Sequence, residues 1–120
     1  MGRFSDLSKA YYGYFASVMN SFLVDTVPND VVFPYLTYEL VDGELEDNLL
    51  MTVRIYDKST SVKTLTECVD KIEQHIGNNL IEVNENNYFT VYKGSPFAQY
   101  FNDVEGGIKS VYINLQINVY

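Results

Sequence analysis

The C-terminal ten residues alternate between apolar and polar side chains without a break. Because successive side chains of a strand point to opposite faces, this pattern predicts a strand from Val111 to Tyr120 with one face in a core. A strand of this kind needs neighbouring strands beside it and other elements over its apolar face. Its apolar members are Val111, Ile113, Leu115, Ile117 and Val119.

Four other segments are typical of strands. Residues 32–41 are rich in aromatic and branched side chains, and Pro34 favours an edge strand or a strand start. Residues 49–56 alternate as a half-buried strand does. Residues 80–83 and 88–92 flank the polar run 84–87, which predicts a hairpin. Residues 42–43 are a hairpin signal between the first two strands, although the acidic residues that follow suit a longer loop equally well.

Two segments show the three- and four-residue spacing of an amphipathic helix. In residues 5–23 the spacing runs from Leu7 to Phe22, and in residues 62–76 it runs from Val62 to Ile76. The residues 59–61 before the second helix are suited to capping it. A single helical turn is expected at 96–101.

These elements predict one α+β domain over residues 1–120. We expect an antiparallel sheet of about four or five strands with two helices packed on one face, in the order α-β-β-α-β-β-β. A chain of 120 residues closes one hydrophobic core rather than two.

No catalytic motif, cofactor fingerprint or metal-ligand set is legible in the chain, so we expect no enzyme activity, no cofactor and no metal. His75 is the only histidine, and its place near a helix C-terminus favours a structural role. Cys68 is the only cysteine and borders an apolar stripe, which favours a buried, inert thiol and a reducing compartment. The acidic residues 42–47 lack the order of a calcium loop, so a solvated hairpin tip is expected.

Tyrosine is the conspicuous excess, with 11 residues in the chain. A tyrosine combines an apolar ring with a polar tip and is enriched at protein interfaces, but half-exposed tyrosines are also common in sheets. Both interpretations stay open. The candidate subunit or partner interface consists of Tyr38, Tyr56, Tyr112 and Tyr120.

The formal net charge of -8 disfavours binding to phosphate backbones and anionic membranes. It is compatible with an acidic surface past which DNA slides without sticking. No run of apolar residues is long enough for a membrane span, and no signal-peptide core is expected at the N-terminus.

The order of elements, together with residues 33–38, 49–56, 65–76 and 108–120, resembles the tail terminator proteins of long-tailed bacteriophages, which complete the tail and join it to the head. The resemblance covers nearly the whole chain as an arrangement of elements and includes no invariant motif. It implies a hexameric ring in the virion neck, assembled in the host cytoplasm. The implied partners are further copies of the chain, the tail tube protein and a head-completion or connector protein, with DNA passing through.

Under this resemblance the candidate channel-facing acidic loop consists of Asp42, Glu44, Glu46 and Asp47. Two alternatives remain. The chain is a head-completion or other neck protein of the same kind of virion, or it is an unrelated small α+β ligand-binding or regulatory domain.

Overall fold

The computed structural model describes residues 3–41, 48–59, 61–77, 80–85, 87–101 and 107–120. Two helices and six strands lie in this part of the chain. In chain order they are α1 (Arg3–Ala16), β1 (Ser21–Leu23), β2 (Tyr35–Tyr38), β3 (Asn48–Lys58), α2 (Lys63–His75), β4 (Ile81–Asn84), β5 (Asn87–Phe101) and β6 (Ile108–Val119).

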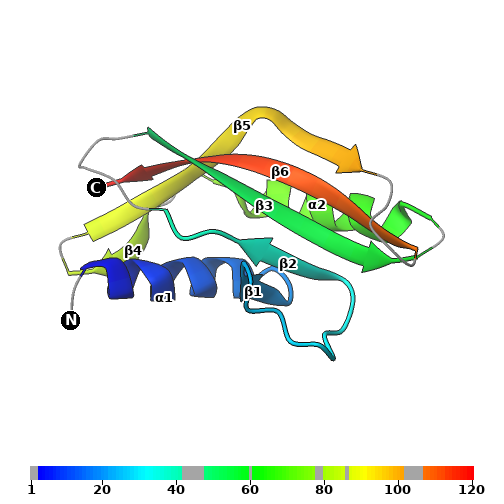
Figure 1. The fold of residues 1–120 in the computed structure, drawn as a ribbon. Helices are drawn as coiled ribbons and strands as arrows, with labels where there is room; N and C mark the ends of the chain where they lie inside the picture. Colours follow the sequence, from blue (N-terminus) through cyan, green and yellow to red (C-terminus); the bar gives the residue numbers. More distant parts are fainter. Residues whose placement is uncertain (1–2, 42–47, 60, 78–79, 86, 102–106) are drawn as a thin grey trace.

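The six strands form one curved sheet in the order β1-β2-β3-β6-β5-β4 (Figure 1). The β1–β2 pair is parallel, and the other neighbours are antiparallel. β6 lies between β3 and β5, and its ladder with β3 runs from the Asn48–Asn118 pair to the Lys58–Ile108 pair. The strongly alternating C-terminal segment is therefore a central strand.

The predicted sheet of four or five antiparallel strands, in the order α-β-β-α-β-β-β, is wrong. The sheet is mixed, has six strands and follows the order α-β-β-β-α-β-β-β. The additional strand is β1, which the sequence pattern placed at the end of a helix over residues 5–23. Phe22 fits the helical spacing, but residues 22–24 are aromatic or apolar and suit a strand equally well.

Hydrogen bonds of the residues after α1 explain why the helix ends at Ala16 and not at residue 23. Ser17 Oγ donates to the carbonyl oxygen of Tyr14 at 2.7 Å and closes the last turn. Beyond it, the carbonyl oxygen of Asn20 accepts from the Leu36 N–H at 2.9 Å, and the Val24 N–H donates to the carbonyl oxygen of Tyr38 at 2.9 Å. These groups complete a parallel ladder with β2, so they are not available to a longer helix.

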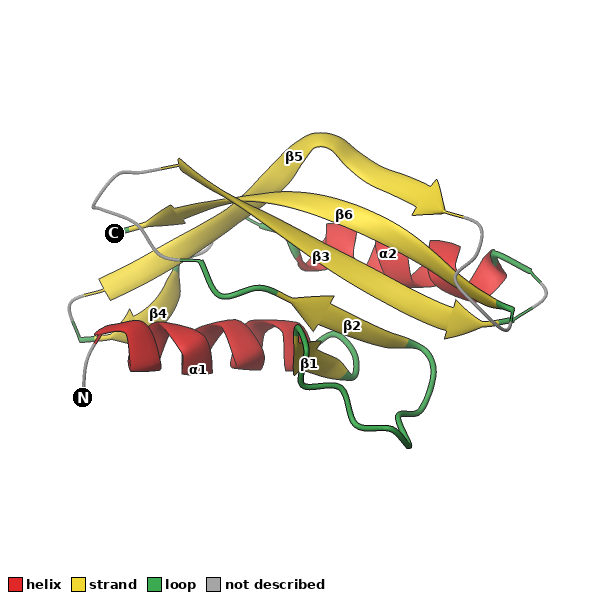
Figure 2. Ribbon diagram, viewed as in Figure 1, coloured by secondary structure: helices red, strands yellow, loops and turns green. Residues whose placement is uncertain are grey.

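The helical turn predicted at 96–101 is also wrong, because these residues belong to β5. Figure 2 shows β5 as one long bent strand. Its pairing with β6 shifts between Lys93 and Ala98, so that residues 94–97 oppose Asn114 alone. Asn114 Nδ2 donates to the carbonyl oxygen of Pro96 at 2.8 Å and holds this bulge. The bulge places Gly94 against the backbone of β6 and accommodates the proline in an edge region.

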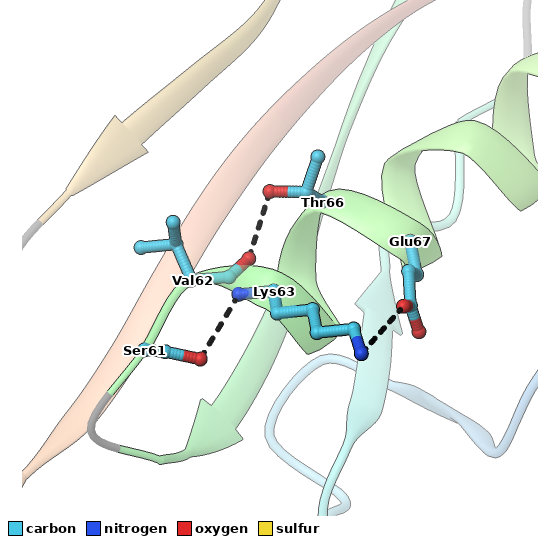
Figure 3. A network of polar contacts seen from close by, with 5 residues as sticks. All are labelled: Ser61, Val62, Lys63, Thr66 and Glu67. Atoms are coloured by element: carbon cyan, nitrogen blue, oxygen red, sulfur yellow. Dashed lines mark hydrogen bonds and ion pairs between the residues drawn. The ribbon is translucent and has the colours of Figure 1, made fainter.

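β2 covers only Tyr35–Tyr38 of the strand predicted over residues 32–41, while the remaining elements follow the sequence pattern. α2, β3 and β6 lie where their apolar spacing predicts them, and β4 and β5 pair as the predicted hairpin. Figure 3 shows the start of α2, where Ser61 Oγ accepts the Lys63 N–H at 3.3 Å and Thr66 Oγ1 donates to the carbonyl oxygen of Val62 at 2.7 Å. The exposed pair of Lys63 and Glu67, 4.0 Å apart, adds little stability at this surface position.

Helix α1 lies between the two edges of the curved sheet, next to β4 at its start and β1 at its end (Figure 1). Asn84 Nδ2 on β4 donates to Asp6 Oδ2 at 3.2 Å. The ring of Tyr11 meets Phe89 edge-on at 5.0 Å, while Phe15 stacks on Tyr38 at 5.2 Å. One helical face thereby contacts strands from both halves of the sheet.

Helix α2 packs on β3 and β6 at the other end of the same sheet face. Its buried residues are Leu65, Cys68 and Ile72. They share one core with the α1 aromatics and with the buried side chains of β3 and β6. Both helices therefore cover one face of the sheet, as the alternation of its strands predicted.

Two glycines give a matched test of this packing. Gly13 lies within α1 with nothing near its Cβ position, whereas a Cβ on Gly94 would lie 2.8 Å from the carbonyl oxygen of Asn114. We expect Gly13→Ala to raise the free energy of unfolding by about 0.5–1 kcal/mol through helix propensity. We expect Gly94→Ala to lower it by about 1–3 kcal/mol through overpacking. Urea denaturation of both variants measures the difference, and a Gly94→Ala variant as stable as the parent would contradict the bulge packing.

Candidate functional site

The face of the sheet turned away from both helices is the candidate site. Along β3 and β6 the residues facing the helices are buried, and those between them are partly or fully exposed except for Ser110, which is buried, as is Thr90 on β5. We call the exposed side the open face. It is formed on the three long strands by Leu50, Thr52, Arg54 and Tyr56 of β3, by Ser110, Tyr112, Asn114, Gln116 and Asn118 of β6, and by Tyr88, Thr90 and Tyr92 of β5.

The open face carries little charge. Arg54 is the only charged side chain among the residues just named, and the other charged side chains on this side lie around them: Lys58 at the end of β3, Glu82 beside Tyr88, and Glu39 after β2. Leu50 is 75% exposed and Tyr92 is 37% exposed on it. Low charge in the middle of a face, together with tyrosines and an arginine, is the composition of a protein interface.

Arg54 lies at the centre of an aromatic cluster. Its guanidinium carbon is 4.8 Å from the centroid of the Tyr56 ring and 4.5 Å from that of Tyr112. Tyr56 is two residues along β3, and Tyr112 is directly opposite Arg54 on β6, so the sheet register brings the three side chains together. Arg54 Nη2 also donates to Ser110 Oγ at 3.0 Å. The guanidinium is thus fixed by two cation–π contacts and a hydrogen bond.

The aromatic cluster continues onto β2 and β1. Tyr35 stacks on Tyr56 with ring centroids 4.9 Å apart and contacts the ring of Phe33 at 5.3 Å. The ring of Phe22 meets Tyr35 edge-on at 6.0 Å. Burial raises the pKa of Tyr35, and neighbouring Tyr56 adds to this effect while Arg54 opposes it. These rings form a half-buried apolar surface next to the arginine.

A hollow of about 250 Å³ opens on the sheet beside Arg54. We call it the Arg54 hollow. Glu39 follows β2 at the rim, and its Oε1 accepts the backbone N–H of Thr52 at 3.3 Å. Its lining residues are Val24, Thr37, Tyr38, Glu39, Thr52, Arg54, Tyr56 and Tyr112. A second hollow, of about 290 Å³, lies between the ends of the helices beside His75 and Ser17 and is wide open to solvent.

The structure separates the tyrosines of the predicted interface. Tyr56 and Tyr112 lie together on the open face, with Arg54 between them. Tyr120 is 38% exposed beyond the end of β6, and its backbone pairs with Tyr88. Tyr38 instead points toward the helices, is 4% exposed, and has a pKa that burial raises. Tyr38 therefore belongs to the core of this chain.

The predicted acidic loop of Asp42, Glu44, Glu46 and Asp47 lies outside the described residues. Its assignment as a channel surface stays a prediction.

The sequence analysis missed the central position of Arg54 and the contributions of Leu50, Tyr88 and Tyr92. Arg54 was visible in the sequence, but its contacts depend on the β3–β6 register, which joins residues far apart in the chain. Tyr88 and Tyr92 alternate with buried Phe89 and Val91. That alternation alone places them on the face opposite the core, so it was a usable signal.

His75 and Cys68 both make contacts that are typical of side chains with a structural role. His75 Nε2 lies 3.1 Å from the carbonyl oxygen of Tyr14 and donates to it, and the imidazole packs on the Tyr14 ring with centroids 4.3 Å apart. Cys68 is 4% exposed, and burial raises the pKa of its thiol. Within the described ranges, no three histidine, cysteine, aspartate or glutamate side chains gather as a metal site.

Comparisons with known proteins add no relative. A scan against models of known families finds no match, and a search among curated proteins finds none either. In the described part of the chain, no helix combines the length and the apolar character that a membrane crossing requires.

The burial of Cys68 predicts that its thiol reacts slowly in the folded chain. At pH 8 we expect the folded chain to react with a disulfide reagent at least about tenfold more slowly than the chain in urea, because the reagent must wait for opening of the core. The release of the chromophoric thiol measures both rates. Equal rates with and without urea would show that Cys68 is accessible in the native state.

Proposed function

We propose that the chain is a structural subunit of a phage neck, forming a ring that terminates the tail tube and joins it to the head. The open face is the observation that carries the proposal, and we assign it to the contact between neighbouring subunits. This assignment agrees with the resemblance of the chain to tail terminator proteins.

The composition of the open face supports this role. A sheet face in contact with water normally carries polar side chains throughout, whereas this one has exposed Leu50 and Tyr92. The amides on β6 are neutral, and Lys58 and Glu82 lie around them at the end of β3 and on β4. The Arg54 cluster adds aromatic side chains and an arginine, which are the residue types that dominate binding energy at interfaces. The rings of Tyr56 and Tyr112 already pack on Arg54, so little side-chain freedom is lost when a partner binds.

The overall charge supports the passage of DNA through the ring. A net charge of -8 repels the phosphate backbone, so nucleic acid passes an acidic wall without being retained. A head-completion protein of the same virion has the same requirement, and the two roles differ in whether the ring stops tube growth.

One observation favours the second candidate function, a small ligand-binding domain. The Arg54 hollow of about 250 Å³ is lined by several polar groups around one cation. Its volume is somewhat below that of the pockets that usually enclose drug-sized ligands, about 300–1,000 Å³. A ligand-binding domain would bind its ligand as a monomer, and this property separates it from a ring subunit.

A charge placed on the open face tests the subunit interface. We expect Leu50→Lys to weaken subunit association by at least about tenfold, because a lysine would lose its hydration in the contact. Native mass spectrometry across a concentration series measures the ring population, with purified tail tubes added in a parallel series. Val62→Lys is the matched control, since Val62 is 47% exposed at the start of α2, away from the open face.

Three outcomes would count against the proposal. The parent chain remains monomeric with and without tubes, rings form but tubes continue to grow, or both lysine variants assemble as the parent does. The first outcome favours a ligand-binding domain, the second favours a head-completion protein, and the third moves the interface away from the open face.

A second variant tests the predicted channel loop. Replacing Asp42, Glu44, Glu46 and Asp47 by lysine is expected to slow DNA ejection from virions while rings still form, because lysines bind phosphates. The matched control replaces the acidic residues Asp30, Glu67, Asp70 and Glu85, which are exposed elsewhere on the chain. Ejection measured by fluorescence of released DNA compares the two. Equal rates of DNA ejection from the loop variant and the parent would show that the loop does not line the channel.

A further inference from the structure

Arg54 has no anionic partner in the part of the chain that the structure describes. The described residues form exposed ion pairs between Lys63 and Glu67 and between Lys93 and Glu73, but no carboxylate among them lies within ion-pair distance of Arg54. This is notable in a chain with sixteen acidic and eight basic side chains. A partly buried arginine normally pairs with a carboxylate, because losing water around an unpaired charge costs free energy.

The hydrogen bonds of the guanidinium are incomplete. Nη2 donates to Ser110 Oγ, whereas Nε is buried and has no acceptor among the described residues. The rings of Tyr56 and Tyr112 contact the guanidinium carbon but offer no strong hydrogen-bond acceptor in that geometry. The Arg54 side chain is therefore held in place while its Nε–H lacks an acceptor among the described residues. A guanidinium fixed in this way is preorganised to bind an anion.

The lining of the Arg54 hollow restricts the anion. Thr37, Thr52 and Glu39 are among its lining residues, and the Thr52 hydroxyl already donates to Asn114 Oδ1 at 3.2 Å. A phosphate would meet Glu39 and the net negative charge with a single arginine to offset them. A carboxylate on a polypeptide carries less charge and is accompanied by a peptide N–H, for which Glu39 is an acceptor.

We propose that the Arg54 hollow binds a carboxylate of a polypeptide segment. The carboxylate accepts hydrogen bonds from the free edge of the guanidinium, a neighbouring peptide N–H of the same segment donates to Glu39, and the tyrosines pack on its apolar atoms. This deepens the proposed function, since it names the chemistry that a subunit seated on the open face presents there. Its test uses the isolated chain and involves no ring.

Nuclear magnetic resonance gives a direct readout. Arg3 and Arg54 are the only arginines in the chain, so two Nε–H signals are expected and an Arg3→Lys variant assigns them. The ¹⁵N-labelled chain is kept dilute enough to be monomeric by light scattering. It is titrated with N-acetylglycine, which presents a terminal carboxylate and a peptide N–H. The N-methylamide of N-acetylaspartate presents a side-chain carboxylate in a second titration.

The proposal expects a saturable shift of the Arg54 Nε–H signal with at least one of the two carboxylates, and the stronger probe identifies the kind of carboxylate. N-acetylglycinamide, which is neutral, should shift the signal at least about tenfold less at equal concentration, because it lacks the charge that pairs with arginine. The backbone amides of Thr52 and Tyr112 should shift in parallel, and the Arg3 signal should not saturate.

Two results would overturn the carboxylate site. Neither carboxylate shifts the Arg54 signal at concentrations up to tens of millimolar, or inorganic phosphate shifts it as strongly as they do. Arg54→Lys supplies the matched variant, because it keeps the charge and removes the planar fork. The Thr52 amide of the Arg54→Lys variant is then followed during the carboxylate titration. If its shifts are as large as in the parent and saturate at the same concentration, the planar guanidinium has no part in binding.

Discussion

The packing of α1 between the two edges of the curved sheet is the constraint on which the rest of the structure depends. β1 and β4 are the outermost strands, and the aromatic face of α1 contacts both sides through Phe15 and Tyr11. The helix fills the inside of the curve, so the apolar alternation of the long strands is satisfied there. The opposite side of the sheet is not covered by either helix. Its side chains are therefore not needed for the core of this chain and can contact another molecule.

Prediction from the sequence succeeded where one local pattern was unambiguous and failed where backbone pairing between distant segments decided the structure. Residues 111–120 alternate without interruption, and the helix after Ser61 has a regular apolar stripe, so both elements were correctly predicted. β1 has three residues and is stabilised by backbone bonds to β2, a contact that local spacing does not encode. The second half of β5 contains Gly94 and Pro96, which indicated a turn, but a bulge held by Asn114 accommodates both.

The candidate site shows the same limit. Tyr112 was chosen from the polar face of the last strand and Tyr56 as a tyrosine on a neighbouring strand, and the structure places them together. Tyr38 was chosen, like Tyr56, as a tyrosine on a neighbouring strand, but β2 is too short for its pattern to decide which face is buried, and Tyr38 lies in the core. The role of Arg54 could be predicted only with the β3–β6 register, because one of the two aromatic rings that contact it, Tyr112, comes from β6.

The central position of β6 has a consequence for how the chain folds. β3 and β5 do not touch as neighbours, and β6, which comes after both in the chain, is the strand that joins them. During synthesis the two halves of the sheet therefore have no ladder between them until the last strand has left the ribosome. Loop closure over so many residues is slow compared with helix formation. The nascent chain must protect its apolar strand faces for that interval, and the early, local formation of α1 and α2 offers the first cover.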